Sequence, residues 1–179
     1  MNGEAPHHPA PATQDRLFAL LAELGIETTT HRHRPVYTVE ESQDLRGLLP
    51  GAHCKSLFLK DKKSVLWLVV ALEDRKLDMK ALGVNIGSAR LSFASPERLM
   101  EYLGVMPGSV TPFALINDRE RHVRVILDAG IIAADIANFH PLSNDATTAI
   151  PPDDLLRFIS HCGHEAQIVD LSGAAENAT

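Results

Sequence analysis

A lysine stands at the start of a predicted apolar strand. Lys55 follows a turn made by Pro50 and Gly51, and the apolar residues 57–59 come almost directly after it. A second apolar stretch, residues 65–72, follows across a short polar turn, so the two stretches predict a hairpin. At the mouth of a central hairpin, the ammonium of Lys55 can bind a phosphate or polarise an ester carbonyl. On the residues alone, a strand-edge lysine in water is the more common interpretation.

A loop with two glycines follows about 50 residues later. Residues 104–113 read Gly-Val-Met-Pro-Gly-Ser-Val-Thr-Pro-Phe. Gly108 permits the backbone to approach a ligand, and amides exposed there can donate to a carbonyl or a ribose. Ser109 adds a hydroxyl group. The same composition also suits an ordinary proline-rich turn between a helix and a strand.

A histidine marks the third polar segment, residues 139–147. His140 precedes a proline, so its backbone is biased towards extended geometry. Its imidazole can orient an amino group or a water molecule. Asn144 and Thr147 can shape the same wall. A lone histidine in a loop is otherwise more often structural.

Other hydrolytic and cofactor-dependent sites lack their sequence patterns. Cys162 lies between His161 and His164, but this spacing matches no common zinc pattern, and neither Cys-x₂-Cys nor His-Glu-x₂-His occurs. There is no Gly-x-Ser-x-Gly elbow, and Cys54 is expected to be a small buried residue rather than a reactive thiol. Neither glycine pattern of nucleotide binding is present. We therefore expect no metal and no cofactor.

Length and composition predict one ordinary globular domain. The chain has 179 residues, of which 45% are hydrophobic and 22% charged. A net charge of −6 argues against broad coating of nucleic acid. No apolar run reaches the roughly 18–20 residues that span a bilayer, so no membrane contact is expected. Two cysteines and the lack of a secretory signal favour the reducing cytoplasm.

Local signals predict an α+β fold with a mixed, largely antiparallel sheet surrounded by helices. We expect a disordered leader over 1–12, one domain over 13–171 and a flexible tail over 172–179. Helix caps and hydrophobic periodicity predict helices at 13–24, 38–45, 77–82, 95–103 and 153–161. Apolar β-type runs predict strands at 26–31, 55–61, 65–72, 113–116, 123–127, 136–139 and 165–171.

Three segments, taken in order, resemble the YbaK/ProX-type aminoacyl-tRNA deacylases. They are residues 51–61, 104–118 and 139–148, and the resemblance extends over residues 13–171. These deacylases are relatives of the editing domain inserted in bacterial prolyl-tRNA synthetases. Within the family, the chain is most similar to the ProX (PrdX) branch, both in its Gly-Ser-Val-Thr-Pro-Phe sequence and in its freestanding length.

The resemblance implies hydrolysis of alanine mischarged onto tRNA(Pro). A site that fits proline also admits the smaller alanine, and lost apolar contacts discriminate by only about 1–3 kcal/mol, so a second, sieving site is needed. An aminoacyl ester is already activated. Positioning a water or the vicinal hydroxyl, together with stabilising the oxyanion, can therefore suffice without a covalent nucleophile.

The resemblance also assigns the site. It implies catalytic roles for Lys55, Gly108, Ser109 and His140, whereas His53 is not assigned to the site. The substrate-binding candidates are Ser56, Leu57, Val70, Met106, Thr111, Pro112, Phe113, Asn144 and Thr147. For the apolar members of this set, core packing is the default interpretation.

Two departures and two alternatives accompany this assignment. Ser56 stands where the family usually has asparagine, and Cys54 where threonine is common. These changes bear on amino-acid preference more than on the reaction.

The implied partner is the acceptor end of tRNA(Pro), with transient contact to prolyl-tRNA synthetase or an elongation factor. The alternatives are a non-catalytic module that binds tRNA or a synthetase, and a deacylase for serine or cysteine esters.

Overall fold

The computed structural model describes residues 9–35 and 49–173. The helices are α1 (Gln14–Glu23), α3 (Met79–Ile86), α4 (Pro96–Leu103), α5 (Ala129–Ile132), α6 (Pro152–His161) and the 3-10 helix η1 (Pro112–Asn117). The strands are β1 (Thr29–Arg32), β2 (Ala52–Asp61), β3 (Leu66–Leu72), β4 (Leu91–Phe93), β5 (Val123–Asp128), β6 (Ala137–Phe139), β7 (Ala146–Ile150) and β8 (Ala166–Val169). The helix predicted at 38–45 lies outside the described residues. Within the described ranges, no helix is both long and apolar enough to cross a bilayer.

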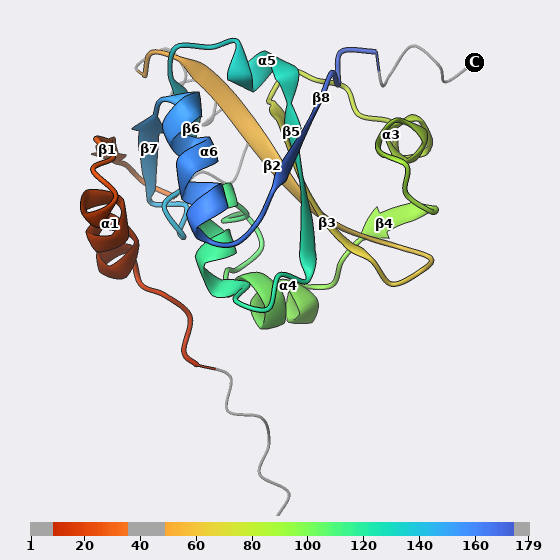
Figure 1. Ribbon diagram of the computed structural model, residues 1–179, viewed down its shortest axis with the longest axis horizontal. Helices are drawn as coiled ribbons and strands as arrows, with labels where there is room; N and C mark the ends of the chain where they lie inside the picture. The colour runs from red at the N-terminus through yellow and green to blue at the C-terminus, as the bar shows by residue number, and fades with distance from the viewer. Residues whose placement is uncertain (1–8, 36–48, 174–179) are drawn as a thin grey trace, which may run out of the picture.

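The strands form one mixed sheet, which confirms the predicted fold class. Their order is β1-β7-β6-β2-β3-β5-β8, and β4 pairs with β2 beside this path. Among the described strands, β1–β7, β2–β3, β2–β4 and β6–β7 pair antiparallel, whereas β2–β6, β3–β5 and β5–β8 pair parallel. Figure 1 shows α1, β1 and β7 at one end of the molecule, α3 and β4 at the other, and the β2–β3 hairpin between them.

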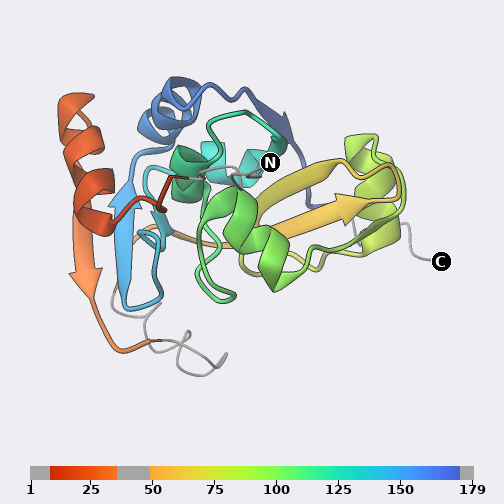
Figure 2. The ribbon, with the colours of Figure 1, turned by 90° about the horizontal axis from the view of Figure 1, so that it is seen from below.

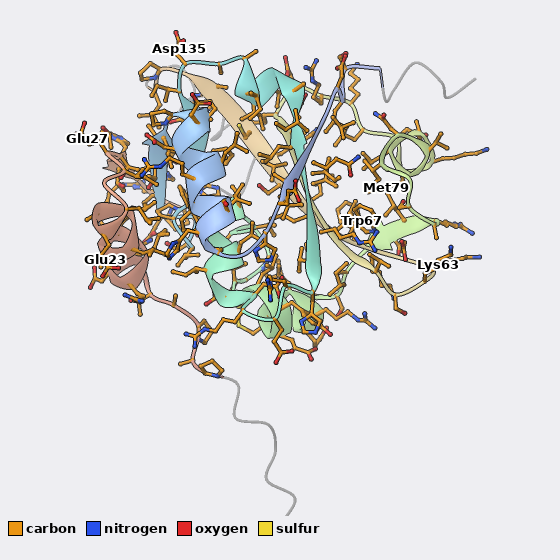
Figure 3. The ribbon with its side chains drawn as sticks, viewed as in Figure 1. Glu23, Glu27, Lys63, Trp67, Met79 and Asp135 are labelled. Atoms are coloured by element: carbon orange, nitrogen blue, oxygen red, sulfur yellow. The ribbon has the colours of Figure 1, made fainter. Side chains whose placement is uncertain are left out.

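Apolar side chains fill both faces of the sheet. On one face, helices α1, α4, α6 and η1 bury residues such as Leu17 and Phe158 against β2, β3 and β5. On the other face, α3 and β4 cover Trp67, with Leu82 buried between them. Figure 3 shows Trp67 and Met79 on the α3 side of the molecule, and Figure 2 shows α3 far from α1 and β1. The central hairpin is therefore held from both sides.

The predicted starts of α1 and α4 are correct and a side-chain cap marks each, whereas α3 spans Met79–Ile86 where a helix over 77–82 was predicted. The Thr13 hydroxyl accepts from the Arg16 amide at 3.2 Å at the start of α1. The Ser95 hydroxyl does the same for Arg98 at 3.2 Å at the start of α4. Asp78 caps α3. Local hydrogen bonds of this kind depend on a few adjacent residues, which is why the sequence alone locates them.

One predicted strand is wrong. Residues 113–116 belong to the helix η1 rather than to a strand. The Thr111 hydroxyl accepts from the Phe113 amide at 3.3 Å, and Pro112 occupies the first turn, where its ring favours a helical start. The Phe113 ring packs edge-to-face on Phe139 and Phe158, with centroids 6.1 and 5.4 Å apart. Tertiary packing of this one ring decides the local conformation.

We expect Phe113→Ala to lower the free energy of unfolding by about 3–5 kcal/mol, because it leaves a cavity between two aromatic rings. Urea denaturation measures the change. Phe93→Ala is the matched control, since Phe93 is 62% exposed and its truncation creates no cavity. Equal effects of the two changes would contradict the packing role of Phe113.

The N-terminal segment contacts the domain before the first helix. Residues 9–12 of the expected leader are described, and the Ala12 amide donates to Asn117 Oδ1 at 2.8 Å. The remainder of the leader, and most of the tail expected over 172–179, lie outside the described residues. The packed chain therefore reaches at least one residue before the predicted boundary at 13.

Candidate active site

The edge of β2 that faces β6 is interrupted. In the described part of the chain, β2 pairs with β6 only through Ala52 and His53. It pairs with β4 only from Leu59 to Asp61. Residues 54–57 therefore lack a strand partner on this side, while β3 covers their other side. Backbone groups and side chains at such a gap are available to a ligand.

Close backbone approach joins β2 to β6 at one end of this gap. The Ala52 amide donates to the Ile136 carbonyl at 2.8 Å. Gly51 has φ +101°, and a Cβ there would lie 2.8 Å from the same carbonyl oxygen. A side chain at this position would push β2 away from the segment that begins β6. Gly51 therefore lets the two strands meet briefly before they part.

Lys55 and Ser56 point to opposite faces of the sheet. The hairpin register pairs Lys55 with Ala71 and Ser56 with Val70. Ala71 belongs to the core on the α3 side, and Val70 to the core on the α6 side. Partners in an antiparallel pair share a face, so Lys55 lies on the α3 side and Ser56 on the other. The structure does not bring their side chains together.

The Lys55 ammonium is partly buried and held in place. Its Nζ donates a hydrogen bond to the backbone carbonyl of Arg75 in the turn after β3. Burial is the main cause that lowers the pKa of Lys55, and the nearby charges of Glu73 and Asp74 oppose it. An ammonium has three donors, and among the described residues the Arg75 carbonyl takes one of them.

His140 lies on the same face as Lys55. The parallel ladder places His53 beside Asn138. Lys55 stands two residues beyond that pair on β2, and His140 stands two residues beyond it, directly after the end of β6; alternation along an extended chain gives both the same face. The electrostatics agree, because the charge of Glu73 acts on both groups. Lys55 and His140 thus flank the point where β2 and β6 separate.

The hydrogen bond of His140 fixes its tautomer. Its Nδ1 lies 3.0 Å from the carbonyl oxygen of Ala146, which can only accept, so Nδ1 carries a proton. Burial, the largest cause, lowers the pKa of His140, so the ring is neutral at pH 7. Nε2 therefore presents a lone pair that can accept a proton or a hydrogen bond.

A second histidine, which the sequence analysis did not assign, lies beside His140. The rings of His33 and His140 are 6.4 Å apart. His33 Nε2 is 2.8 Å from the hydroxyl of Thr147, a buried residue of β7. Thr147 was expected in a loop, but it pairs with His31 in the β1–β7 ladder. Nothing in the sequence near His33 signals this contact, because β1 and β7 are far apart along the chain.

The glycine loop meets the β6–β7 turn. Gly108 has φ +89°, and a Cβ there would lie 3.8 Å from Asn144 Nδ2, an ordinary contact. Glycine is therefore needed for the left-handed backbone rather than for close approach. The Ser109 amide donates to the Met106 carbonyl at 3.0 Å, so it is not free for a ligand. Ser109 is buried, and Met106 is 63% exposed at the rim.

Several predicted substrate contacts are core residues instead. Val70, Thr111 and Phe113 have no exposed surface, and Pro112 is buried in η1. Side chains without accessible surface cannot touch a ligand, so these four support the site by packing. Leu57 packs against the core cluster on the α3 side. The expectation that Val70, Thr111, Pro112 and Phe113 line the amino-acid pocket is corrected accordingly, whereas Leu57 is half-buried and its role stays a prediction.

His53 makes a structural hydrogen bond, and the thiols of Cys54 and Cys162 remain protonated. His53 shares the Lys55 face, since the two are two positions apart, and its Nε2 donates to the Leu49 carbonyl at 3.0 Å. Burial raises the pKa of Cys54 to about 12 and that of Cys162 to about 12. Neither thiol is an activated nucleophile at neutral pH. Over the described ranges, no three His, Cys, Asp or Glu groups form a metal-binding cluster.

Fold and site together define an α/β domain with a lysine and a neutral histidine at an interrupted sheet edge. The chain belongs to the aminoacyl-tRNA editing domain family, whose model matches residues 33–158. It is 37% identical over 156 residues to the prolyl-tRNA editing protein ProX of Acetoanaerobium sticklandii, covering 87% of this chain and 95% of that protein.

Two further comparisons extend the match. The chain is 31% identical over 132 residues to the multifunctional Ser/Thr-tRNA deacylase ProXp-y of Escherichia coli K12, covering 67% of this chain and 79% of that protein. A crystal structure of a proposed trans-editing enzyme for prolyl-tRNA synthetase superimposes with a TM-score of 0.62 at 18% identity, covering 89% and 98% of the two chains. The likeness to that structure concerns the fold alone.

Proposed function

We propose that the protein is an aminoacyl-tRNA deacylase that edits in trans and hydrolyses Ala-tRNA(Pro). The observation that carries the proposal is the short parallel ladder that ends at His53 and Asn138, since Lys55 and His140 each stand two residues beyond it. Membership of the editing family and 37% identity to a prolyl-tRNA editing protein support the reaction class and the tRNA.

The two side chains suit ester hydrolysis without a covalent intermediate. The ammonium of Lys55 binds the terminal phosphate or polarises the ester carbonyl as negative charge develops on its oxygen. The lone pair on His140 Nε2 accepts a hydrogen bond from the attacking water or from the substrate amino group. The Asn144 amide provides a further polar contact beside Gly108, and the buried Ser109 supports the loop that carries it.

The partner of this site is the acceptor end of mischarged tRNA(Pro), met in the cytoplasm. A net charge of −6 implies that RNA contacts are local rather than spread over the surface. Local contacts of this kind suit a brief encounter, either with free aminoacyl-tRNA or with tRNA passing from prolyl-tRNA synthetase to an elongation factor.

A specific observation favours a second candidate substrate. One relative, at 31% identity, is named a Ser/Thr-tRNA deacylase. Ser56, which replaces the asparagine usual in the family, faces away from Lys55, so the case for this substrate rests on the relative alone. Serine esters are therefore the main alternative to alanine, and cysteine esters, of similar size, belong in the same test.

A panel of mischarged tRNAs tests the function. We expect rapid release of alanine from Ala-tRNA(Pro) and little release of proline from Pro-tRNA(Pro). Ser-, Thr- and Cys-charged tRNAs complete the panel. Preferred release of serine would replace alanine with the second candidate. Release no faster than spontaneous hydrolysis for every ester would overturn the enzymatic proposal and favour a non-catalytic tRNA-binding module.

The pH dependence of the reaction follows from two lowered pKa values. Burial lowers the pKa of His140 below its ordinary value, so the ring stays neutral and active to below about pH 6.5, and activity falls only in more acid solution. Burial also lowers the pKa of Lys55, so the alkaline fall begins below about pH 10.4. A plot of kcat/KM against pH, corrected for spontaneous hydrolysis, checks both limbs. An acid limb centred above pH 6.5 would contradict this assignment.

A further inference from the structure

A buried carboxylate lies behind Lys55 and outside the site itself. Asp128, at the end of β5, has no exposed surface. One carboxylate oxygen accepts from Arg75 Nε at 2.9 Å and from the Leu72 amide at 3.1 Å. The other accepts from the Gly130 amide at 3.0 Å. Burial alone would raise the pKa of Asp128, but these donors lower it, so the carboxylate is charged.

A contribution to folding stability is a poor explanation for the buried ion pair between Asp128 and Arg75. A buried salt bridge is often no more stabilising than apolar residues of similar volume, because both charges lose their hydration. Asp128 does, however, fix a particular piece of backbone. It binds the last amide of β3 and the guanidinium of Arg75, three residues further along the chain. The turn after β3 is therefore clamped at both of its ends.

The clamped turn is the one that holds Lys55. The backbone carbonyl of Arg75 accepts from Lys55 Nζ. In the same turn, the Glu73 amide donates to the His53 carbonyl on β2 at 2.9 Å, and the charge of Glu73 acts on Lys55. Arg75 thus links the two groups. Its guanidinium contacts the Asp128 carboxylate, and its backbone carbonyl accepts from the Lys55 ammonium.

We propose that Asp128 and Arg75 are positioning residues, which set where the Lys55 ammonium sits at the β2 edge. The inference rests on the proposed function of Lys55 in ester hydrolysis. A lysine side chain has four rotatable bonds, and ordering it costs conformational entropy. A carbonyl fixed by a buried ion pair provides a rigid acceptor that offsets this cost and aims the ammonium.

The test removes the ion pair without leaving an unpaired buried charge. In the double variant Asp128→Asn with Arg75→Gln, a neutral amide pair replaces the two charges. We expect kcat for the preferred mischarged tRNA to fall about ten- to a hundredfold with little change in KM, because misplacement of a catalytic group acts on the transition state. The single variant Arg75→Lys keeps the charge and should recover part of the loss.

Two readouts separate positioning from mere loss of stability. In a Lys55→Ala background, the double change should have no additional effect on kcat, because its path runs through Lys55. By NMR of lysine-labelled protein without tRNA, the pKa of Lys55 should rise towards its ordinary value as the ammonium returns to water.

Asp118→Asn is the matched control. It disturbs the other buried pair, in which His164 Nε2 lies 2.8 Å from Asp118, and should leave the Lys55 pKa unchanged.

The outcomes are distinguishable from failure of the proposed function. The NMR measurement needs no substrate, so an unchanged Lys55 pKa in the folded double variant overturns the inference whatever ester the enzyme prefers. An additive loss of kcat in the Lys55→Ala background also overturns it. If the double variant does not fold, the same two measurements are made on Arg75→Lys, which retains the charge. A shifted pKa in a protein without deacylase activity would leave the positioning intact and reject only the catalysis.

Discussion

Lys55→Ala should reduce kcat for the preferred mischarged tRNA by about a hundred- to a thousandfold, the effect of removing one donor that stabilises an oxyanion. The reason is geometric. Lys55 lies at the gap in β2, and its ammonium donates to the backbone carbonyl of Arg75, which holds it in place beside the gap. Single-turnover hydrolysis under saturating enzyme measures the chemical step directly.

Lys62→Ala is the control for that experiment. Lys62 is exposed in the turn of the same hairpin, so its loss removes one positive charge without touching the β2 gap. A decrease for Lys55→Ala that is matched by Lys62→Ala would show general attraction of RNA instead of a role at the ester. Retention of near wild-type kcat by Lys55→Ala would remove the lysine from the mechanism altogether.

His140→Asn should lower kcat by about a hundredfold or more, within the range for loss of a general base. An asparagine amide can still donate to the Ala146 carbonyl, as His140 Nδ1 does, but it offers no basic lone pair in place of Nε2. The change therefore keeps the local hydrogen bond and removes the proton acceptor. The acid limb of the pH profile should disappear with it, which a series of rates between pH 5 and 8 would reveal.

His161→Ala serves as the histidine control, since His161 is exposed at the end of α6. It should leave both rate and pH profile unchanged. If His140→Asn reduces the rate but preserves the acid limb, then His140 orients the substrate amino group and another group takes the proton. His33, whose ring lies 6.4 Å away, would be the next residue to substitute.

The elements correctly predicted from sequence are those fixed by neighbouring residues. Ser95, Pro96 and Gly104 bound α4 as expected, because capping hydrogen bonds and a left-handed glycine act within one turn. The β2–β3 hairpin was also predicted, since continuous apolar runs flank a short polar turn. Elements set by distant partners were not. Strand β4 pairs with β2, from which β3 and α3 separate it along the chain, and β7 pairs with β1 near the N-terminus as well as with its neighbour β6.

The site divides in the same way. The types of its residues, a lysine after a turn, a loop glycine and a histidine before a proline, were evident from the chain and from its resemblance to a family of deacylases. Their arrangement was not, and the supposed pocket residues Val70 and Phe113 proved to be core, because periodicity marks a residue as apolar without saying which side of a sheet is open.

By itself, the sequence determined the reaction class and the residue types available for it, because caps, turns and apolar runs are local and family motifs are read directly. Only the tertiary structure decided that β2 pairs with β6 just before Lys55 and His140, that Ser56 faces the other way, and that Arg75 contacts both Asp128 and Lys55. The physical reason is that parallel pairing, strand parity and buried ion pairs depend on where distant segments meet.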